Sequence, residues 1–323
     1  MQNNNFLFKF YYRWWKNIDK SIFLLISLLF VIGLFFSLVS TSLIASDKLD
    51  TNSYFFFFKH LIYILIGIFI IFIFSSVNSD KLFKYSIMLF FISLISLFLV
   101  PIIGIEVKGS KRWIDLFFLP RFQPIELLKP FLIIILASVL SNNKNSNLYL
   151  KYLLSIVIIS TISLFLIMQP DIGQTLLVVF SWGVLIFTSG INIFFLLVFA
   201  ILLSILLTFL IIYVPRFDYI QGRIFSFFNR DTGAHNFQSD KAIDSIVSGG
   251  FFGKGIGEGT LKNRVPEAHT DYIISVISEE FGVIAIMLIL LLFLILIYRV
   301  LKKVNYEKNE KAKLVLIGCV SLI

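Results

Sequence analysis

The chain has 323 residues, of which 58% are hydrophobic and 15% are charged, with 38 phenylalanines and a formal net charge of +9. This is more apolar surface than a soluble core of that size can bury, so a water-soluble globular protein is excluded and a polytopic membrane protein is predicted. The excess of cations does not indicate nucleic acid, because cations in a membrane protein sort by the side of the bilayer that they face.

Eight apolar runs are long enough to cross a bilayer as helices, and they predict an all-α fold. Residues 1–20 precede the first run and carry tryptophans beside lysines, which is typical of an anchor at the membrane surface. No cleavage site follows that run, so it is expected to remain as a span. The sixth and seventh runs are uncharged and continuous, and we place a tight turn between them at Gly190. The runs cover residues 21–45, 53–76, 85–104, 124–141, 152–168, 174–189, 191–214 and 272–300.

The cations of the short connections predict the orientation. If all eight runs span, residues 1–20, the connections that contain Lys81 and Lys144, and the basic segment 299–313 fall on one side. The positive-inside rule assigns that side to the cytoplasm, which places the amino terminus there. The remaining connections are then outer loops: residues 105–123, 169–173 and 215–270.

The first outer loop carries cations on the side where they are unexpected. Lys111 and Arg112 either clamp an anion through charge-assisted hydrogen bonds or extend to lipid headgroups, and charge alone leaves both interpretations open. Glu126 and Lys129 follow one turn apart in an apolar helix, which favours an ion pair with each other or with a partner helix, in a structural or a functional role. In the second outer loop, Asp171 follows a proline and is expected to cap the next helix, with substrate contact as the alternative.

The third outer loop ends in the stretch around which the chain is organised. Six glycines between residues 249 and 259 surround Lys254, and such a loop suits an anionic headgroup because glycine lets the backbone approach a ligand closely. Asp271 follows where the sequence turns apolar, so it is expected at the boundary between water and membrane. His269 beside it favours a hydrogen-bonding role over a metal-ligating one.

The helix that begins after Asp271 is predicted to have one polar face. Asp271, Ser275 and Glu279 recur at helical spacing, and Glu280 points away from that face. The sequence has a single cysteine, Cys319, which excludes an internal disulfide, and it has no cluster with metal-ligand spacing.

Four stretches resemble, in order and spacing, the signatures of the SEDS family of membrane glycosyltransferases, which includes FtsW and RodA. They are KGSKRWIDL with FQPIELLKP, QPDIGQT, RIFSFFNRDTGAHNFQSDKAIDSIVSGGFFGKGIGEGT and VPEAHTDYIISVISEEFG, and they cover most of the chain. The segments YYRWWKNIDK, QPDIGQT and GEGTLKNRVPEAHTD are more similar to the division enzyme FtsW than to the elongation enzyme RodA.

The resemblance implies a SEDS-type helical bundle in the cytoplasmic membrane of a bacterium, which polymerises lipid II at the outer face during cell division. It implies an inverting transfer with Asp271 as general base and undecaprenyl diphosphate as leaving group. Its implied partners are a class B penicillin-binding protein, an FtsI-like transpeptidase, and other division proteins. A divalent cation, Mg²⁺ or Mn²⁺, shared with the substrate is the expected cofactor. The implied substrate-binding residues are Lys111, Arg112, Arg223, Lys254, Glu126, Lys129, His269 and Glu279.

Two features depart from the family pattern. Ile125 replaces the usual serine of the Gln-Pro-Ser-Glu motif but leaves its acid, Glu126, in place. The family has about ten spans, so the last spans are expected to be missing from this chain. A lipid II flippase or other transporter, an elongation polymerase like RodA, and a non-catalytic scaffold for division proteins remain alternatives. The unusual residues gather on the outer side and no nucleotide motif occurs, which favours polymerisation over transport.

Overall fold

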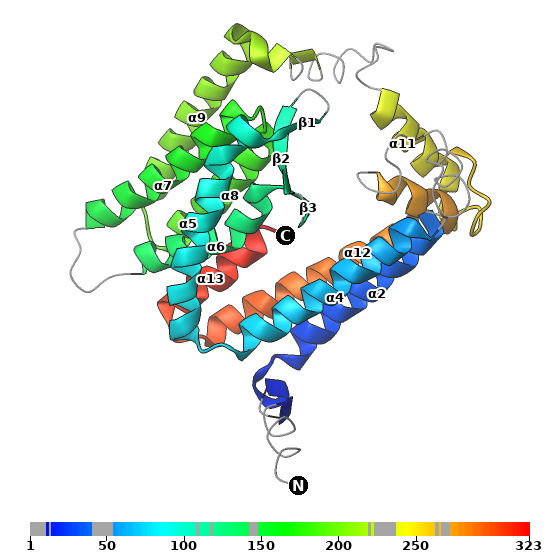
Figure 1. Cartoon of the computed structure of the whole chain (residues 1–323), viewed down its shortest axis with the longest axis horizontal. Helices are drawn as coiled ribbons and strands as arrows, with labels where there is room; N and C mark the ends of the chain where they lie inside the picture. Colours follow the sequence, from blue (N-terminus) through cyan, green and yellow to red (C-terminus); the bar gives the residue numbers. More distant parts are fainter. Residues whose placement is uncertain are drawn as a thin grey trace. The chain divides into compact units, whose positions relative to one another are not determined.

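The structure is a computed structural model, shown in Figure 1. It describes residues 11–12, 14–40, 54–107, 110–116, 119–141, 148–218, 221–222, 237–261, 265 and 272–323. The chain forms two compact units. The first unit comprises Met1–Val77 with Tyr219–Arg299, and the second comprises Asn78–Asp218 with Val300–Ile323.

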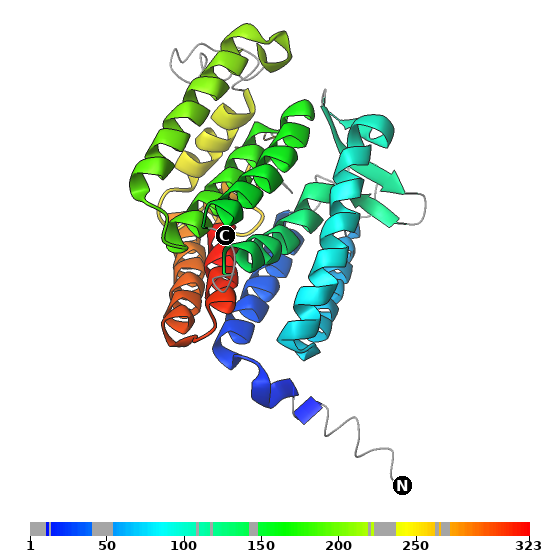
Figure 2. The same ribbon diagram turned by 90° about the vertical axis from the view of Figure 1, so that its left-hand side faces the viewer.

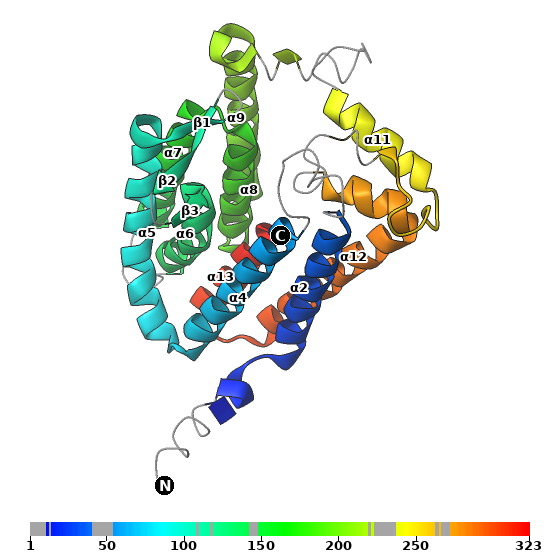
Figure 3. The ribbon, with the colours of Figure 1, turned by 45° about the vertical axis from the view of Figure 1, so that its right-hand side comes forward.

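The first unit is built on α2 (Lys20–Ser40), α4 (Phe55–Ser76), α11 (Phe237–Gly249) and most of α12 (Ile273–Tyr306). Helices α2 and α4 lie side by side (Figure 3). Phe35 and Phe36 of α2 both make edge contacts with Phe281 of α12, at centroid distances of 5.8 and 5.4 Å. The tryptophan-rich segment before α2 folds onto the end of α4, where Trp14 donates a hydrogen bond to Ser75 at 2.7 Å. Aromatic side chains therefore fasten the helices of this unit together.

The central helix of the second unit is α6 (Pro124–Leu140). It packs against α5 (Ser79–Ile103), α7 (Leu148–Met168), α8 (Ile172–Thr188) and α13 (Glu310–Ser321). Leu128, Leu132, Leu136 and Leu140 recur every four residues along α6 and are at most 2% exposed. Their spacing places them on one stripe of the helix, and this stripe is the centre of the core. Because lipid tails are as apolar as leucine, this core is held by close packing rather than by exclusion of water.

A small antiparallel sheet follows α5. It consists of β1 (Ile105–Val107), β2 (Ser110–Leu116) and β3 (Leu119–Phe122), in the order β1-β2-β3. The sheet stands at the end of α5, as Figure 2 shows, and β2 contacts both α5 and α6. The sequence predicted only a loop here, because the strands are short and their pairing depends on contacts with the two helices.

Within the described residues, each apolar run predicted from the sequence forms a helix, and the turn at Gly190 is confirmed. Gly190 has a φ of 93°, and the side chain of Asn192 caps α9 (Ile193–Tyr213) directly after it. Six described helices are long and apolar enough to cross a membrane: α2, α4, α5, α7, α9 and α12. Helices α6 and α8 have 17 residues each, or about 26 Å of length. They are slightly shorter than the ~30 Å hydrocarbon layer, and both lie in the packed core.

Further helical segments lie where the sequence predicted loops. Helix α11 lies within the long outer loop of residues 215–270, which begins with a short 3₁₀ turn at Pro215–Phe217. At the basic segment 299–313, α12 continues to Tyr306 and α13 begins at Glu310, so most of that segment is helical.

Replacing Gly318 with valine is expected to lower the free energy of unfolding by about 2 kcal/mol. Gly318 lies where α13 packs against α6 and α8, and a Cβ atom there would overlap Ile133 and crowd Leu185. Thermal unfolding in detergent measures the effect. The control is Cys319→Val, because Cys319 is exposed on the same helix. Equal melting temperatures for the two variants would contradict this packing.

Candidate functional site

A polar cluster gathers in the second unit where β2, the start of α6 and the start of α8 meet. We call it the α6–α8 polar cluster. Its members are Arg112, Gln123, Glu126, Lys129, Asp171 and Gln174.

Glu126 and Lys129 form the ion pair that their spacing predicted. Lys129 Nζ lies 2.7 Å from Glu126 Oε2, and the lysine side chain is 13% exposed while the glutamate side chain is 51% exposed. Gln174 completes a triangle: its amide donates to Glu126 Oε1 at 2.9 Å and accepts from Lys129 at 3.2 Å. The lysine charge is thus compensated among apolar helices, while the glutamate keeps an accessible edge.

Asp171 caps α8, as its place after Pro170 predicted. Its carboxylate accepts from the backbone N–H of Gln174 at 3.5 Å and from the side-chain amide of Gln123 at 3.0 Å. Arg112 Nε lies 3.6 Å away, and the aspartate side chain is only 8% exposed. Gln174 therefore joins the two halves of the cluster, with its backbone bound to Asp171 and its side chain bound to Glu126 and Lys129.

Lys111 and Arg112 point to opposite faces of β2, because side chains alternate along a strand. Arg112 is turned toward the helices, where its guanidinium donates to the backbone carbonyls of Gln169 and Pro170. Lys111 is exposed on the other face. The two cations that the sequence grouped as diphosphate ligands thus occupy different surroundings.

A second polar cluster lies in the first unit, where the glycine loop (residues 249–261) meets a break in α12. The helix is interrupted at Gly282, which has a φ of 77°. Such a break leaves backbone groups without partners in their own helix, and the loop supplies them. The N–H groups of Lys254 and Gly255 donate to the carbonyls of Glu279 and Glu280, at 2.9 and 3.1 Å, and the N–H of Val283 donates to the Gly250 carbonyl at 3.0 Å.

Glycine is required where the loop backbone touches the helix backbone. A Cβ atom on Gly253 would overlap the carbonyl of Glu280, and one on Gly282 would overlap the carbonyl of Phe251. The sequence interpretation assigned the glycines to close approach of a ligand. In the structure, at least these two allow close approach of one backbone to another.

Glu279 is 0% exposed and sits inside the glycine loop. Its Oε1 atom accepts from Lys254 Nζ at 3.2 Å and from the backbone N–H groups of Thr260 and Leu261 at 2.8 and 2.9 Å. Its Oε2 atom accepts from Ser245 of α11 at 3.1 Å. Glu280 is also enclosed, and it accepts from the N–H of Gly257 at 3.3 Å. The carboxylate of Glu279 therefore holds α11, the loop and α12 in one arrangement.

Three of the predicted site residues, Asp271, His269 and Arg223, lie outside the described residues. Asp271 immediately precedes Tyr272, one position before α12 begins. Within the described part of the chain, no group of three or more His, Cys, Asp or Glu side chains could hold a metal ion.

Sequence reasoning missed Gln123, Gln174 and Ser245 as site residues. The available signal for Gln174 was a polar amide in the first turn of an apolar helix. Ser245 offered no such signal, because it meets Glu279 only through the fold.

Comparison with known proteins gives consistent matches along the chain. The family model described as cell cycle protein, for FtsW, RodA and SpoVE, matches residues 19–323. The probable peptidoglycan glycosyltransferase FtsW of Haemophilus influenzae is 30% identical over 289 residues, which are 88% of this chain and 72% of that protein. The protein of the same name in Buchnera aphidicola subsp. Acyrthosiphon pisum is 33% identical over 288 residues, 87% of this chain and 70% of that protein.

Two solved structures share the fold. The crystal structure of Thermus thermophilus rod shape determining protein RodA aligns with a TM-score of 0.66 at 22% identity, covering 95% of this chain and 82% of that chain. A chain from a structure described as a peptidoglycan synthase complex that coordinates polymerization and crosslinking aligns with a TM-score of 0.73, also at 22% identity, covering 94% and 83%.

Replacing Glu279 with glutamine is expected to lower the free energy of unfolding by about 2 kcal/mol. The amide would present N–H donors to a ring of donors that now surrounds a charged acceptor. Thermal unfolding and limited proteolysis of the glycine loop measure the change. Glu258→Gln is the matched control, because Glu258 is exposed in the same loop. Identical melting and cleavage for the two variants would show that Glu279 does not anchor the loop.

Proposed function

The chain belongs to the cell cycle protein family of FtsW, RodA and SpoVE, and from this membership we propose that it is a peptidoglycan glycosyltransferase that polymerises lipid II during cell division. The observation that carries the proposal is the identity of 30% to a probable FtsW over 72% of that protein's length. The resemblance stated from the sequence motifs is thereby confirmed at the level of the family.

The protein is a multi-pass membrane protein, and the proposed orientation places its amino terminus in the cytoplasm. In the second unit, the charges at the start of α5 and of α13 are mainly lysines, whereas the α6–α8 polar cluster lies at the opposite end of α5, beside the sheet. The positive-inside rule assigns the lysine-rich end to the cytoplasm and the cluster to the outer face.

The proposed reaction is an inverting transfer. Asp271 removes the proton from the acceptor sugar hydroxyl as that oxygen bonds to the anomeric carbon of the donor. The bond from that carbon to the diphosphate oxygen breaks, and undecaprenyl diphosphate leaves with the electron pair. An inverting displacement requires a base and stabilisation of the leaving group, but no covalent sugar–enzyme intermediate.

The candidate substrate-binding cations divide between two proposed roles. Lys111 is exposed and Arg223 belongs to the long outer loop, so we assign these two to the diphosphate. Arg112 is paired with Asp171 and Lys254 with Glu279, so they act mainly by fixing the α6–α8 polar cluster and the glycine loop. Glu126, Lys129 and Gln174 line the edge of the cluster, and Glu126 is the accessible acceptor for a substrate hydroxyl. His269 is the proposed hydrogen-bonding neighbour of Asp271.

The proposed partner is a class B penicillin-binding protein that crosslinks the strands, together with other division proteins. The support is the similarity of fold to a chain of a peptidoglycan synthase complex. A transpeptidase next to the polymerase would receive the new strand as it is made.

Asp271→Asn is expected to reduce glycan synthesis from labelled lipid II by about a hundredfold or more, because it removes the general base. The purified chain is assayed with its partner transpeptidase, and melting temperatures are compared with the wild type. Asp240→Asn is the control, since Asp240 is an exposed acid of the same outer loop. Undiminished product from Asp271→Asn would refute the assignment, and no product from the wild type would favour a transporter or a scaffold.

Chelation with EDTA is expected to abolish the same activity, and added Mg²⁺ or Mn²⁺ is expected to restore it. A divalent cation would neutralise the diphosphate of the substrate, where it needs no cluster of protein ligands. The assay is repeated with Asp271→Asn to separate cation dependence from the base. Full activity in EDTA would remove the cation from the proposal.

A further inference from the structure

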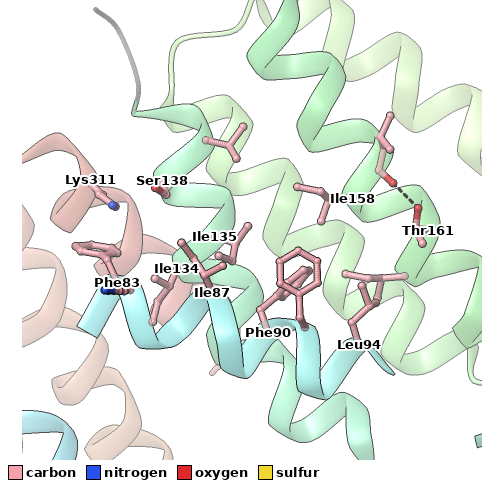
Figure 4. A pocket seen from close by; sticks show the side chains of 15 residues that line it. Phe83, Ile87, Phe90, Leu94, Ile134, Ile135, Ser138, Ile158, Thr161 and Lys311 are labelled. Atoms are coloured by element: carbon pink, nitrogen blue, oxygen red, sulfur yellow. Dashed lines mark hydrogen bonds between the residues drawn. The ribbon is translucent and has the colours of Figure 1, made fainter. Parts of the chain in front are cut away.

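An apolar groove of about 640 Å³ lies in the second unit between α5, α6 and α7 (Figure 4). Its walls are apolar side chains such as Phe90, Leu94 and Ile158. One of its few hydroxyl groups, that of Thr161, donates to the Val157 carbonyl of its own helix at 2.8 Å and so is already satisfied. The rim of the groove includes side chains that are 55% exposed. The groove therefore offers a hydrocarbon chain a dry place to bind.

The length of the groove matches a single leaflet. Its lining residues on α5 run from Phe83 to Leu94 along one face of the helix. Eleven residue steps correspond to about 16 Å at ~1.5 Å per residue. The hydrocarbon layer is about 30 Å thick, so the groove spans close to half of it.

Positive charge marks one end of the groove. Lys84 and Lys311 are the charged residues of the lining, and they come from the starts of α5 and α13. Lys311 Nζ lies 3.4 Å from the centroid of the Phe83 ring, a contact that attracts the ammonium group without neutralising it. Partial burial lowers the pKa of the Lys311 ammonium group, and the negative charge of Asp80 opposes that shift. The ion pairs found among the described residues include neither lysine.

The groove is separate from the α6–α8 polar cluster. Glu126 and Lys129 lie at the start of α6, whereas the groove uses Ile134, Ile135, Ser138 and Val139 near its end. From Glu126 to Ser138 the helix rises about 18 Å. A ligand at the lysine end therefore does not occupy the proposed polymerase site.

We propose that this groove binds an anionic phospholipid, with one acyl chain along α5 and the phosphate held between Lys84 and Lys311. The apolar walls are as long as one leaflet and can pack against the acyl chain. The two ammonium groups can bind the phosphodiester through charge-assisted hydrogen bonds. The positive-inside rule places this lipid in the cytoplasmic leaflet. Bound there, it would join the start of α13 to the start of α5. The proposal does not depend on the glycosyltransferase activity.

The first test measures lipid retention by native mass spectrometry. The purified chain is released from nanodiscs of phosphatidylglycerol and phosphatidylcholine, and the ratio of the two retained lipids is compared between variants. Each lysine near an anionic surface contributes on the order of fivefold, so Lys84→Gln with Lys311→Gln is expected to lower the ratio about tenfold or more. The control, Lys81→Gln with Lys302→Gln, removes the same charge outside the groove and should leave the ratio unchanged. Equal ratios for the two double variants would overturn the proposal.

The second test uses the wild type alone, so it does not depend on whether a variant folds. A phosphatidylglycerol with a photoreactive group in its acyl chain should label peptides that contain Phe91 and Val157, whose side chains flank the groove from α5 and α7. Millimolar inorganic phosphate should not displace it. Labelling confined to other helices, as when another segment fills the groove, would overturn the proposal, and displacement by phosphate would refute binding of the acyl chain.

Discussion

Inside a membrane, a backbone N–H or C=O group without a partner costs several kcal/mol. Helix α12 interrupts its own hydrogen-bond ladder at Gly282, and the glycine loop satisfies the groups that the break exposes. The loop is fixed in turn by the buried carboxylate of Glu279, which binds Lys254 and two backbone N–H groups. The position of α11, the path of the loop and the start of α12 all follow from this arrangement. Asp271 lies in the sequence two residues before Ile273, where α12 begins.

Charged groups near the start of α6 are compensated by their neighbours. Glu126 and Lys129 share Gln174, and Asp171 is bound by Gln123 and paired with Arg112. The start of α6 and the start of α8 are therefore coupled twice, through Gln174, which belongs to both sets, and through the bond from Gln123 to Asp171. Buried polar groups that are mutually satisfied stay in one geometry, whereas a partly satisfied set is costly in a low dielectric. The cluster is therefore suited to holding a polar substrate group against the edge of Glu126 that remains accessible.

The two ends of the second unit differ in their chemistry. At the sheet, most of the cluster's charges are paired within the protein. At the opposite end, Lys84 and Lys311 line one end of the apolar groove. In the proposal above, their positive charges bind the phosphate of a phospholipid. This asymmetry agrees with the positive-inside rule, and it separates a proposed site for a polar substrate from a proposed site for a structural lipid.

The sequence by itself determined the long apolar helices, because a chain in hydrocarbon can satisfy its backbone only within each segment, so a long apolar run becomes a helix. It also determined local features: the turn at Gly190, the cap at Asp171 and the pair of Glu126 with Lys129, which need contacts over a few residues only. The tertiary structure alone decided that β1 to β3 form a sheet, that Ser245 meets Glu279, and that Gln174 bridges Glu126 and Lys129. These partners stand up to 48 residues apart. A local sequence pattern cannot predict contacts between residues so far apart in the sequence, because these contacts form only when the helices pack together.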